Sequence, residues 1–226
     1  LNKIWGNQSS ILVGDYLLSR CFEMMVEDGN LEILKLLSST SALISQGEIL
    51  QLQHKGDVEM LEETYLKIIS NKTAALFLAA AKIGPIVTEK ENKYKDALES
   101  YGKNIGLTFQ IADDTLDYNS DLKVFGKHIG NDFFEGKVTL PIILLFQKIN
   151  ENEKKLLKDF FLKENRTEND FKKVLELIKI NNIINECYSK AEHYINLASN
   201  SLNIFQKSNE KDILKNLTTF SLERNF

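Results

Sequence analysis

Acidic and amide side chains are concentrated in one short stretch of the chain, from Phe109 to Asp117. If this stretch is helical, four of them fall within an arc of about 100° on one side: Gln110, Asp113, Asp114 and Asp117. Carboxylates this close repel one another unless a cation or a proton intervenes. Oxygen ligands suit Mg²⁺, which takes one or two carboxylates together with substrate phosphates. The stretch therefore indicates a magnesium site, and a solvated acidic face is the alternative.

The next segment, 119–137, is the one long polar interruption in the chain and is rich in Gly, Lys and Asp. Its Lys127 and Lys137 can reach back over the carboxylates. Three glycines permit the positive φ angles of tight turns: Gly126, Gly130 and Gly136. Carboxylates and lysines around one cavity suit a metal-bridged polyphosphate, because phosphate needs both its ion and its counter-charges. An ordinary surface loop with mixed charges is the alternative.

Helices must position these residues. Apolar residues recur at spacings of three and four rather than two, and proline is restricted to Pro85 and Pro141. The pattern predicts helices over 9–27, 31–53, 60–83, 91–119, 139–149, 151–164, 168–179, 182–206 and 210–221. No internal repeat, low-complexity tract or domain linker interrupts them. We therefore predict one all-α domain over residues 1–226.

Polar residues occupy several helix faces that should be core. Lys72 shares a stripe with Ile68, and Asp15 shares one with Leu18. Because unpaired buried charges are costly, these residues and the aspartates together predict a polar cavity inside the bundle. Gly47 lies on the apolar face of 31–53, where a glycine often marks the close approach of a ligand or another backbone.

Composition excludes some functions. The net charge of −4 gives no support to nucleic-acid binding. We expect neither a leader nor a membrane span, because the given sequence contains no charged-then-apolar start and no apolar run of sufficient length. Cys21 and Cys187 lie far apart and fit no metal spacing, so we expect buried thiols in a reducing, cytoplasmic compartment.

Taken together, the motifs resemble those of the trans-polyprenyl diphosphate synthases, especially the long-chain members such as octaprenyl diphosphate synthases. The resemblance covers roughly residues 1–147 and is carried, in order, by Trp5-Gly6-Asn7-Gln8, Val13 to Arg20, Gln46-Gly47-Glu48, Lys72-Thr73-Ala74, Phe109 to Tyr118, and Gly126-Lys127 to Leu140-Pro141. It implies an isoprenoid-synthase helical bundle around a central apolar cavity. It also implies Mg²⁺-dependent, head-to-tail condensation of isopentenyl diphosphate onto an allylic diphosphate such as farnesyl diphosphate.

The resemblance assigns roles to individual residues. Metal binding by the family's second aspartate-rich motif falls on Asp113, Asp114 and Asp117. The allylic diphosphate would be held by Lys72, Lys127 and Lys137. Thr73 and Gln110 would line the reacting end, so the expected catalytic residues are Lys72, Thr73, Gln110 and Lys127. The product would be a membrane-bound lipid that serves as a quinone side chain, and the enzyme would be a homodimer.

One part of the family pattern lies outside this sequence. The family's first aspartate-rich motif and an arginine pair precede the Trp-Gly-Asn-Gln segment, whereas this sequence starts at Leu1, only four residues before Trp5. We therefore expect that the domain lacks its N-terminal helices in this sequence. Those helices would carry the remaining metal ligands and part of the isopentenyl diphosphate site.

Three other functions fit parts of the sequence. A terpene cyclase or head-to-head synthase shares the helical class, but the second metal motif of cyclases usually has an Asn/Asp, Ser/Thr, Glu pattern that is absent from this sequence. A non-catalytic partner subunit of a heteromeric synthase would be expected to lose metal or phosphate residues, which this chain keeps. An unrelated helical scaffold protein is the remaining alternative.

Overall fold

The computed structural model describes residues 2–119 and 129–222, and its regular elements in these ranges are all helices. In chain order they are α1 (Asn2–Asp28), α2 (Leu31–Gln53), α3 (Glu62–Ile69), the π-helical turn η1 (Ser70–Ala74), α4 (Ala75–Val87), α5 (Asn92–Leu116), α6 (Asn131–Glu135), α7 (Leu140–Lys148), α8 (Glu151–Leu162), α9 (Glu168–Ile180), α10 (Ile183–Ser201), the 3₁₀ turn η2 (Leu202–Ile204) and α11 (Asn209–Phe220). The all-α prediction is confirmed.

The predicted helices match these elements closely, with three differences. The predicted helix 60–83 is interrupted by η1, and it extends through Pro85 to Val87. The short helix α6 lies inside the polar segment and was not predicted. α1 begins earlier than predicted, at Asn2, and Gly6 kinks it with a φ of 75°.

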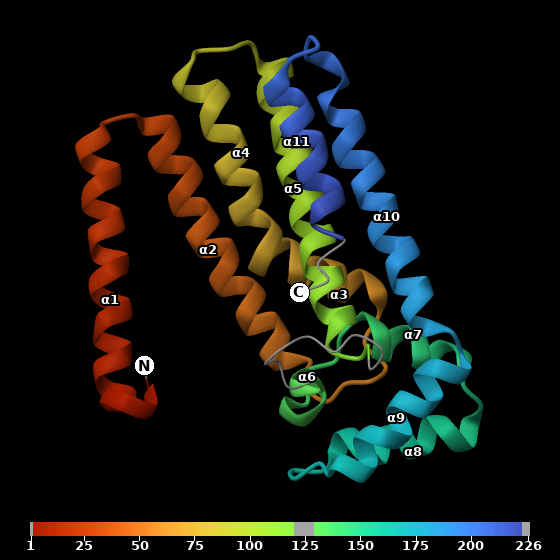
Figure 1. Cartoon of the computed structure of the whole chain (residues 1–226). Helices are drawn as coiled ribbons and strands as arrows, with labels where there is room; N and C mark the ends of the chain where they lie inside the picture. The colour runs from red at the N-terminus through yellow and green to blue at the C-terminus, as the bar shows by residue number, and fades with distance from the viewer. Residues whose placement is uncertain (1, 120–128, 223–226) are drawn as a thin grey trace.

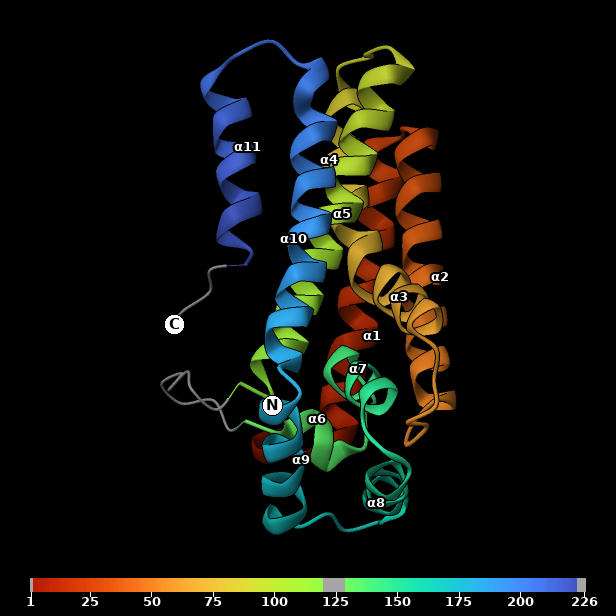
Figure 2. The same ribbon diagram turned by 90° about the vertical axis from the view of Figure 1, so that its right-hand side faces the viewer.

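The central helix of the bundle is α5, which packs between α4 and α10 (Figure 1). The main core lies where the second half of α5 meets α3, α7, α8, α9 and α10. Figure 2 shows α8 and α9 gathered at this end of the bundle. In α7, all six residues from Leu140 to Leu145 are buried, and Pro141 stands in the first turn, where its missing N–H needs no partner. The polar segment is therefore anchored at its C-terminal end to a rigid, buried helix.

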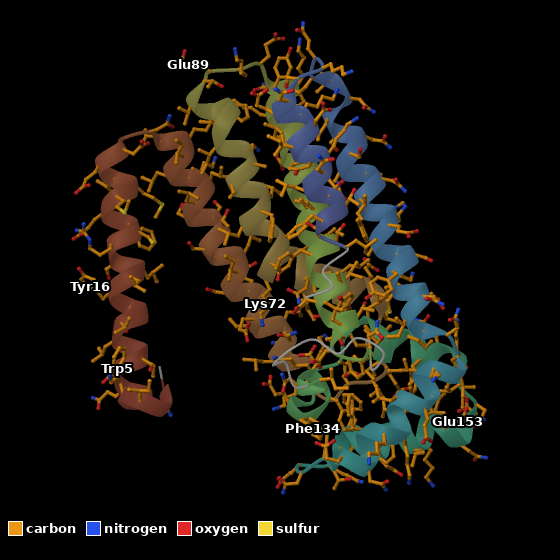
Figure 3. The ribbon with its side chains drawn as sticks, viewed as in Figure 1. Trp5, Tyr16, Lys72, Glu89, Phe134 and Glu153 are labelled. Atoms are coloured by element: carbon orange, nitrogen blue, oxygen red, sulfur yellow. The ribbon has the colours of Figure 1, made fainter. Side chains whose placement is uncertain are left out.

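α1 stands apart from the other helices in Figure 1, and its side chains project into open space (Figure 3). Trp5 is 61% exposed and Tyr16 is 64% exposed. Asp15 is also exposed in this chain, so the prediction that it faces a cavity is wrong here, because no described element covers that face of α1. Cys21 on the same helix is exposed, contrary to prediction, whereas Cys187 is buried.

An apolar pocket of about 650 Å³ lies between α4, α5 and α11. Phe77 and Phe109 line one part of it, and Leu217 and Phe220 of α11 line another. None of the predicted site residues that the structure describes is in its lining, so among these residues the pocket is separate from the polar site around the aspartates of α5. Among the described helices, none combines the length and apolar character that a membrane span requires.

Candidate active site

Four side chains from η1, α5 and α3 form a continuous series of hydrogen bonds. The Thr73 hydroxyl donates to Oε1 of Gln110 (2.7 Å), and Nε2 of Gln110 donates to Oδ1 of Asp114 (2.7 Å). The Tyr65 hydroxyl donates to Oδ2 of the same carboxylate (2.7 Å). Because Gln110 accepts through its oxygen and donates through its nitrogen, its amide has one orientation. The series therefore fixes Thr73 and Gln110 relative to the acidic face of α5.

Asp117 joins the C-terminal end of α5 to α6. Its Oδ2 accepts from the backbone N–H of Asp132 (2.8 Å), and its carbonyl oxygen accepts from the N–H of Gly130 (2.9 Å). Gly130 has a φ of 87°, as its position in a predicted tight turn requires. These bonds bring Asp132, to which the sequence assigned no role, beside the aspartates of α5.

Burial and neighbouring acidic charges change the pKa values of two carboxyls, that of the buried Asp114 and that of the partly buried Asp132. Burial raises the pKa of Asp114 to about 8, and the charges of Asp132 and Asp113 act in the same direction, against the hydrogen bonds from Tyr65 and Gln110. Burial, followed by the charge of Asp117, raises the pKa of Asp132 to about 6. In both cases, desolvation and repulsion between like charges disfavour the ionised carboxylate. A bound cation would relieve this repulsion.

Lys72 projects from η1 toward α2 (Figure 3). Its Nζ donates to Oε1 of Gln51 (2.7 Å) and lies 2.5 Å from Oε2 of Glu48. A Cβ built on Gly47 would lie 2.6 Å from the backbone nitrogen of Lys72, so only a glycine allows α2 to approach η1 this closely. The predicted close approach at Gly47 is therefore to another backbone.

Lys137 comes directly after the turn that ends α6. Its Nζ lies 2.5 Å from Oε2 of Glu135 and 3.7 Å from Oδ1 of Asp132. Partial burial alone would lower the pKa of Lys137, but the hydrogen bond to Glu135 and the charges of Asp132 and Glu48 outweigh it and raise that pKa. Glu48 therefore acts on both described lysines of the predicted diphosphate site, Lys72 and Lys137.

The structure brings most of the predicted site together. Thr73, Gln110 and Asp114 are bonded directly, whereas Lys127 lies outside the described residues. Across residues 2–119 and 129–222, no three carboxylate, imidazole or thiolate groups converge closely enough to hold a metal ion unaided. Mg²⁺ often takes only one or two carboxylates with water and phosphate oxygens. The surplus of acidic charge around Asp114 and Asp132 fits such an ion, and the metal site stays a prediction.

Four residues that contact the predicted site were not assigned to it from the sequence: Glu48, Gln51, Tyr65 and Asp132. In the sequence, Glu48 stands out only as part of the Gln46-Gly47-Glu48 motif, and Tyr65, three residues before Ile68, only by its spacing on the apolar face that Ile68 shares with Lys72. Gln51 lies three residues after Glu48, a spacing that places both on one side of α2. This spacing is the signal that could have identified the pair.

Comparison with known proteins identifies the family. The model of the polyprenyl synthetase family matches residues 1–178. The chain belongs to the polyprenyl synthetase family. It is similar to the all-trans-nonaprenyl-diphosphate synthase (geranyl-diphosphate specific) of Rhodobacter capsulatus, with 34% identity over 99% of this chain and 68% of that protein. It is also similar to the octaprenyl diphosphate synthase of Escherichia coli K12, with 42% identity over 63% of this chain and 44% of that protein.

A solved structure gives the same result. The polyprenyl synthase of Caulobacter crescentus CB15, crystallised with calcium and isoprenyl diphosphate, superposes with a TM-score of 0.94 and 36% identity over 100% of this chain and 69% of that one. The prenyltransferase function and the isoprenoid-synthase fold expected from the sequence are thereby confirmed at the level of the polyprenyl synthetase family.

Proposed function

We propose that the protein containing this chain is a Mg²⁺-dependent synthase that condenses isopentenyl diphosphate head-to-tail onto an allylic diphosphate. The observation that supports this proposal is the hydrogen-bonded series Thr73–Gln110–Asp114, which joins a neighbour of Lys72 in the chain to one of the α5 aspartates. Lysines and carboxylates around one site suit a diphosphate bound with a cation. The structure crystallised with calcium and isoprenyl diphosphate supports this choice of ligands.

The residues of this chain would act on the departing diphosphate. Cleavage of the allylic C–O bond leaves negative charge on the diphosphate oxygens, and ammonium groups fixed beside them stabilise that charge as it develops. Lys72 and Lys137 are the described candidates, and Lys127 is a third from the sequence. Thr73 and Gln110 would orient the allylic end of the substrate, because the hydrogen bond between them fixes the orientation of both side chains.

The magnesium site would use the acidic face of α5. Asp113, Asp114 and Asp117 are the proposed ligands, and Mg²⁺ would neutralise part of the diphosphate charge when bound. Asp114 accepts one hydrogen bond on each oxygen, so a second lone pair on each oxygen remains available. Asp132 is near enough to act on their charges and would support the same ion.

We propose octaprenyl diphosphate, the precursor of a quinone side chain, as the product. The Escherichia coli relative supports this length, although the nonaprenyl-named relative aligns with more of the chain. A homodimer and a cytoplasmic location remain predictions. The alternative is a non-catalytic subunit of a heteromeric synthase, and the presence of Lys72, Lys137 and the aspartates disfavours it.

Product analysis tests the proposal. The natural protein is incubated with farnesyl diphosphate and labelled isopentenyl diphosphate, with Mg²⁺ in one sample and with a chelator in its control. We expect labelled octaprenyl diphosphate in the first sample only. A shorter or longer labelled product would correct the chain length. Absence of product until a second, different subunit is added would instead establish the non-catalytic alternative.

A further inference from the structure

Arg166 lies in the loop between α8 and α9 and has no part in the proposed diphosphate chemistry. Its Nη1 donates to the carbonyl oxygen of Phe134 (3.2 Å), and its Nη2 donates to the carbonyl oxygen of Phe161 (2.6 Å). The guanidinium carbon lies 5.5 Å from the centroid of the Phe161 ring, within the range of a cation–π contact. One side chain therefore joins α6 to the C-terminal end of α8.

The same guanidinium covers Gly136, which ends α6. A Cβ built on Gly136 would lie 2.6 Å from Nη2 of Arg166, and the backbone there has a φ of 74°. From the α2–α3 loop, the N–H of Gly56 donates to the carbonyl oxygen of Gly136 (2.9 Å). Three segments that are distant in the sequence thus meet at this glycine.

Partial burial of a guanidinium is unfavourable, so the arrangement needs a reason. Burial lowers the pKa of Arg166, and its buried Nε has no hydrogen-bond partner in the part of the chain that the structure describes. An apolar side chain would avoid both penalties. It could not, however, supply a rigid, planar set of donors that holds carbonyl oxygens of two segments at once. Arg166 therefore fixes the geometry of this turn at some expense of stability.

The turn that Arg166 holds leads directly into Lys137, whose backbone N–H donates to the carbonyl oxygen of Asp132 (2.8 Å). We propose that Arg166 is a positioning residue for the diphosphate site and holds Lys137 where its ammonium group meets the allylic diphosphate. This inference rests on the proposed function, which assigns Lys137 to that substrate. It also gives a role in the site to the region beyond residue 147, where the sequence indicated only helices.

A double-mutant cycle tests whether Arg166 acts through Lys137. The natural protein is compared with Arg166→Met, Lys137→Met and the double variant, by measuring KM for farnesyl diphosphate, kcat and Tm. Lys163→Met is the matched control. Lys163 lies in the same loop, but its ammonium group donates to Oδ1 of Asp170 in α9 (2.8 Å) and stands 5.0 Å from the Phe160 ring of α8, rather than binding the turn at Gly136.

We expect Arg166→Met to raise KM for farnesyl diphosphate roughly tenfold in the natural background and less than about twofold in the Lys137→Met background. Lys163→Met should lower Tm, because the hydrogen bond to Asp170 is lost, without changing that KM. If Arg166→Met does not fold, Arg166→Lys replaces it. An ammonium group keeps the charge but lacks the planar fork whose two nitrogens reach the two carbonyl oxygens separately, so this variant should give an intermediate KM.

Two results would overturn the inference. One is an equal rise in KM in both backgrounds, which would mean that Arg166 acts through a group other than Lys137. The other is an unchanged KM in Arg166→Met while Lys137→Met weakens binding, which leaves the proposed function intact. If neither Lys137→Met nor Lys72→Met changes KM, the proposed diphosphate site is wrong, and this inference falls with it.

Discussion

Lys72 has two partners on α2 before any substrate is bound. Glu48 and Gln51 lie one turn apart and both contact its Nζ. A diphosphate would replace the carboxylate of Glu48 as the partner of this ammonium group. The lysine is thus held in place, but by groups that a more highly charged ligand can displace.

Replacing Lys72 by Met removes the charge and keeps the aliphatic stem. We expect KM for the allylic diphosphate to rise at least about tenfold, because a fixed positive charge is lost. Stability should change by less than about 1 kcal/mol, since the ion pair with Glu48 is partly exposed. Lys67→Met, in α3, is the control and should change neither quantity. A large loss of Tm with unchanged substrate affinity would make Lys72 a structural residue instead.

The aspartates should be essential for turnover but not for folding. Asp113→Ala or Asp114→Ala should reduce turnover by at least a factor of about 100, as expected for the loss of a main electrostatic contribution. Asp113→Ala should fold like the natural protein, because it removes one charge from a group of repelling carboxylates. Asp114→Ala should also fold but with a lower Tm, because Tyr65 and Gln110 lose their hydrogen-bond acceptor. Turnover at saturating Mg²⁺ and a circular dichroism spectrum check the two statements. Turnover like that of the natural protein would exclude the metal assignment.

The lowered pKa of Asp170 makes the stability of the fold depend on pH, and this effect does not involve the proposed diphosphate site. The hydrogen bond from Lys163, with others from Thr167, holds the pKa of Asp170 at about 2. Because this pKa is lowered on folding, the stabilisation is complete above the unfolded pKa of about 3.9 and is lost as pH falls toward 2. Asp170→Asn should therefore lower the free energy of unfolding by about 1–2 kcal/mol at pH 6.

Denaturant titration at pH 6 and pH 3 measures this effect. The difference between the natural chain and Asp170→Asn should shrink at the lower pH. At pH 3 the Asp170 carboxyl is largely protonated in the unfolded chain, so folding must release that proton and loses part of the ionic stabilisation. Asp159→Asn on the exposed side of α8 is the control and should show little difference at either pH. A difference that is constant from pH 6 to pH 3 would rule out the ionic contribution.

At the scale of the elements, η1 marks a limit of prediction from the spacing of apolar residues: the spacing locates the helix but not the face on which Lys72 lies. The spacing of apolar residues correctly predicted nearly every helix and the all-α class, because burial of one face determines where a helix forms. It placed Lys72 on the stripe of Tyr65 and Ile68, however, and a π turn takes extra residues and rotates the helix faces beyond it. Tyr65 and Ile68 are buried, whereas the Lys72 side chain is 33% exposed and faces α2.

The residues of the site that were not predicted from the sequence reach it through contacts between distant segments. The acidic face of α5 was predicted because three aspartates in one helix have a fixed spacing. Asp132 and Arg166 were not predicted: the glycines of the two turns are recognisable in the sequence, but the segments that these turns bring together are not. Contacts between segments that are far apart in sequence decided which additional residues join the site.

Substitution of Gly47, at the contact between α2 and η1, should have the opposite effect on stability from substitution of Gly14, which faces open space on α1. Gly47→Ala should destabilise the protein by about 1–3 kcal/mol, because its Cβ would lie 2.6 Å from the backbone of Lys72. It should also raise KM for the allylic diphosphate by moving Lys72. Gly14→Ala in α1 meets nothing within 4 Å and should stabilise the chain by up to about 1 kcal/mol. Equal effects of the two on Tm would contradict the close packing at Gly47.

At the scale of the whole molecule, α1 exposes the longest run of large apolar side chains among the described helices. Large apolar residues are exposed along its length: Ile4, Trp5, Ile11, Leu12, Val13, Tyr16, Leu17, Leu18, Phe22, Met24 and Val26. An apolar surface of this extent usually belongs to a contact. The relatives are longer than this chain, which spans 68% of the Rhodobacter capsulatus protein and 69% of the Caulobacter crescentus structure. We therefore expect this face to be covered in the natural protein.

Substitution of two of these residues tests that expectation. Ile11→Gln and Leu18→Gln, made together, should leave Tm of the isolated 1–226 chain unchanged, because both side chains are already more than half exposed there. They should also reduce the binding of a dye that reports apolar surface. In the natural protein, the same pair should lower Tm, since amides would replace buried apolar groups. Ile180→Gln, at a residue 79% exposed at the end of α9, is the control and should be neutral in both forms. If the pair is equally harmless in the natural protein, the face is exposed there too, and neither upstream helices nor a second copy covers it.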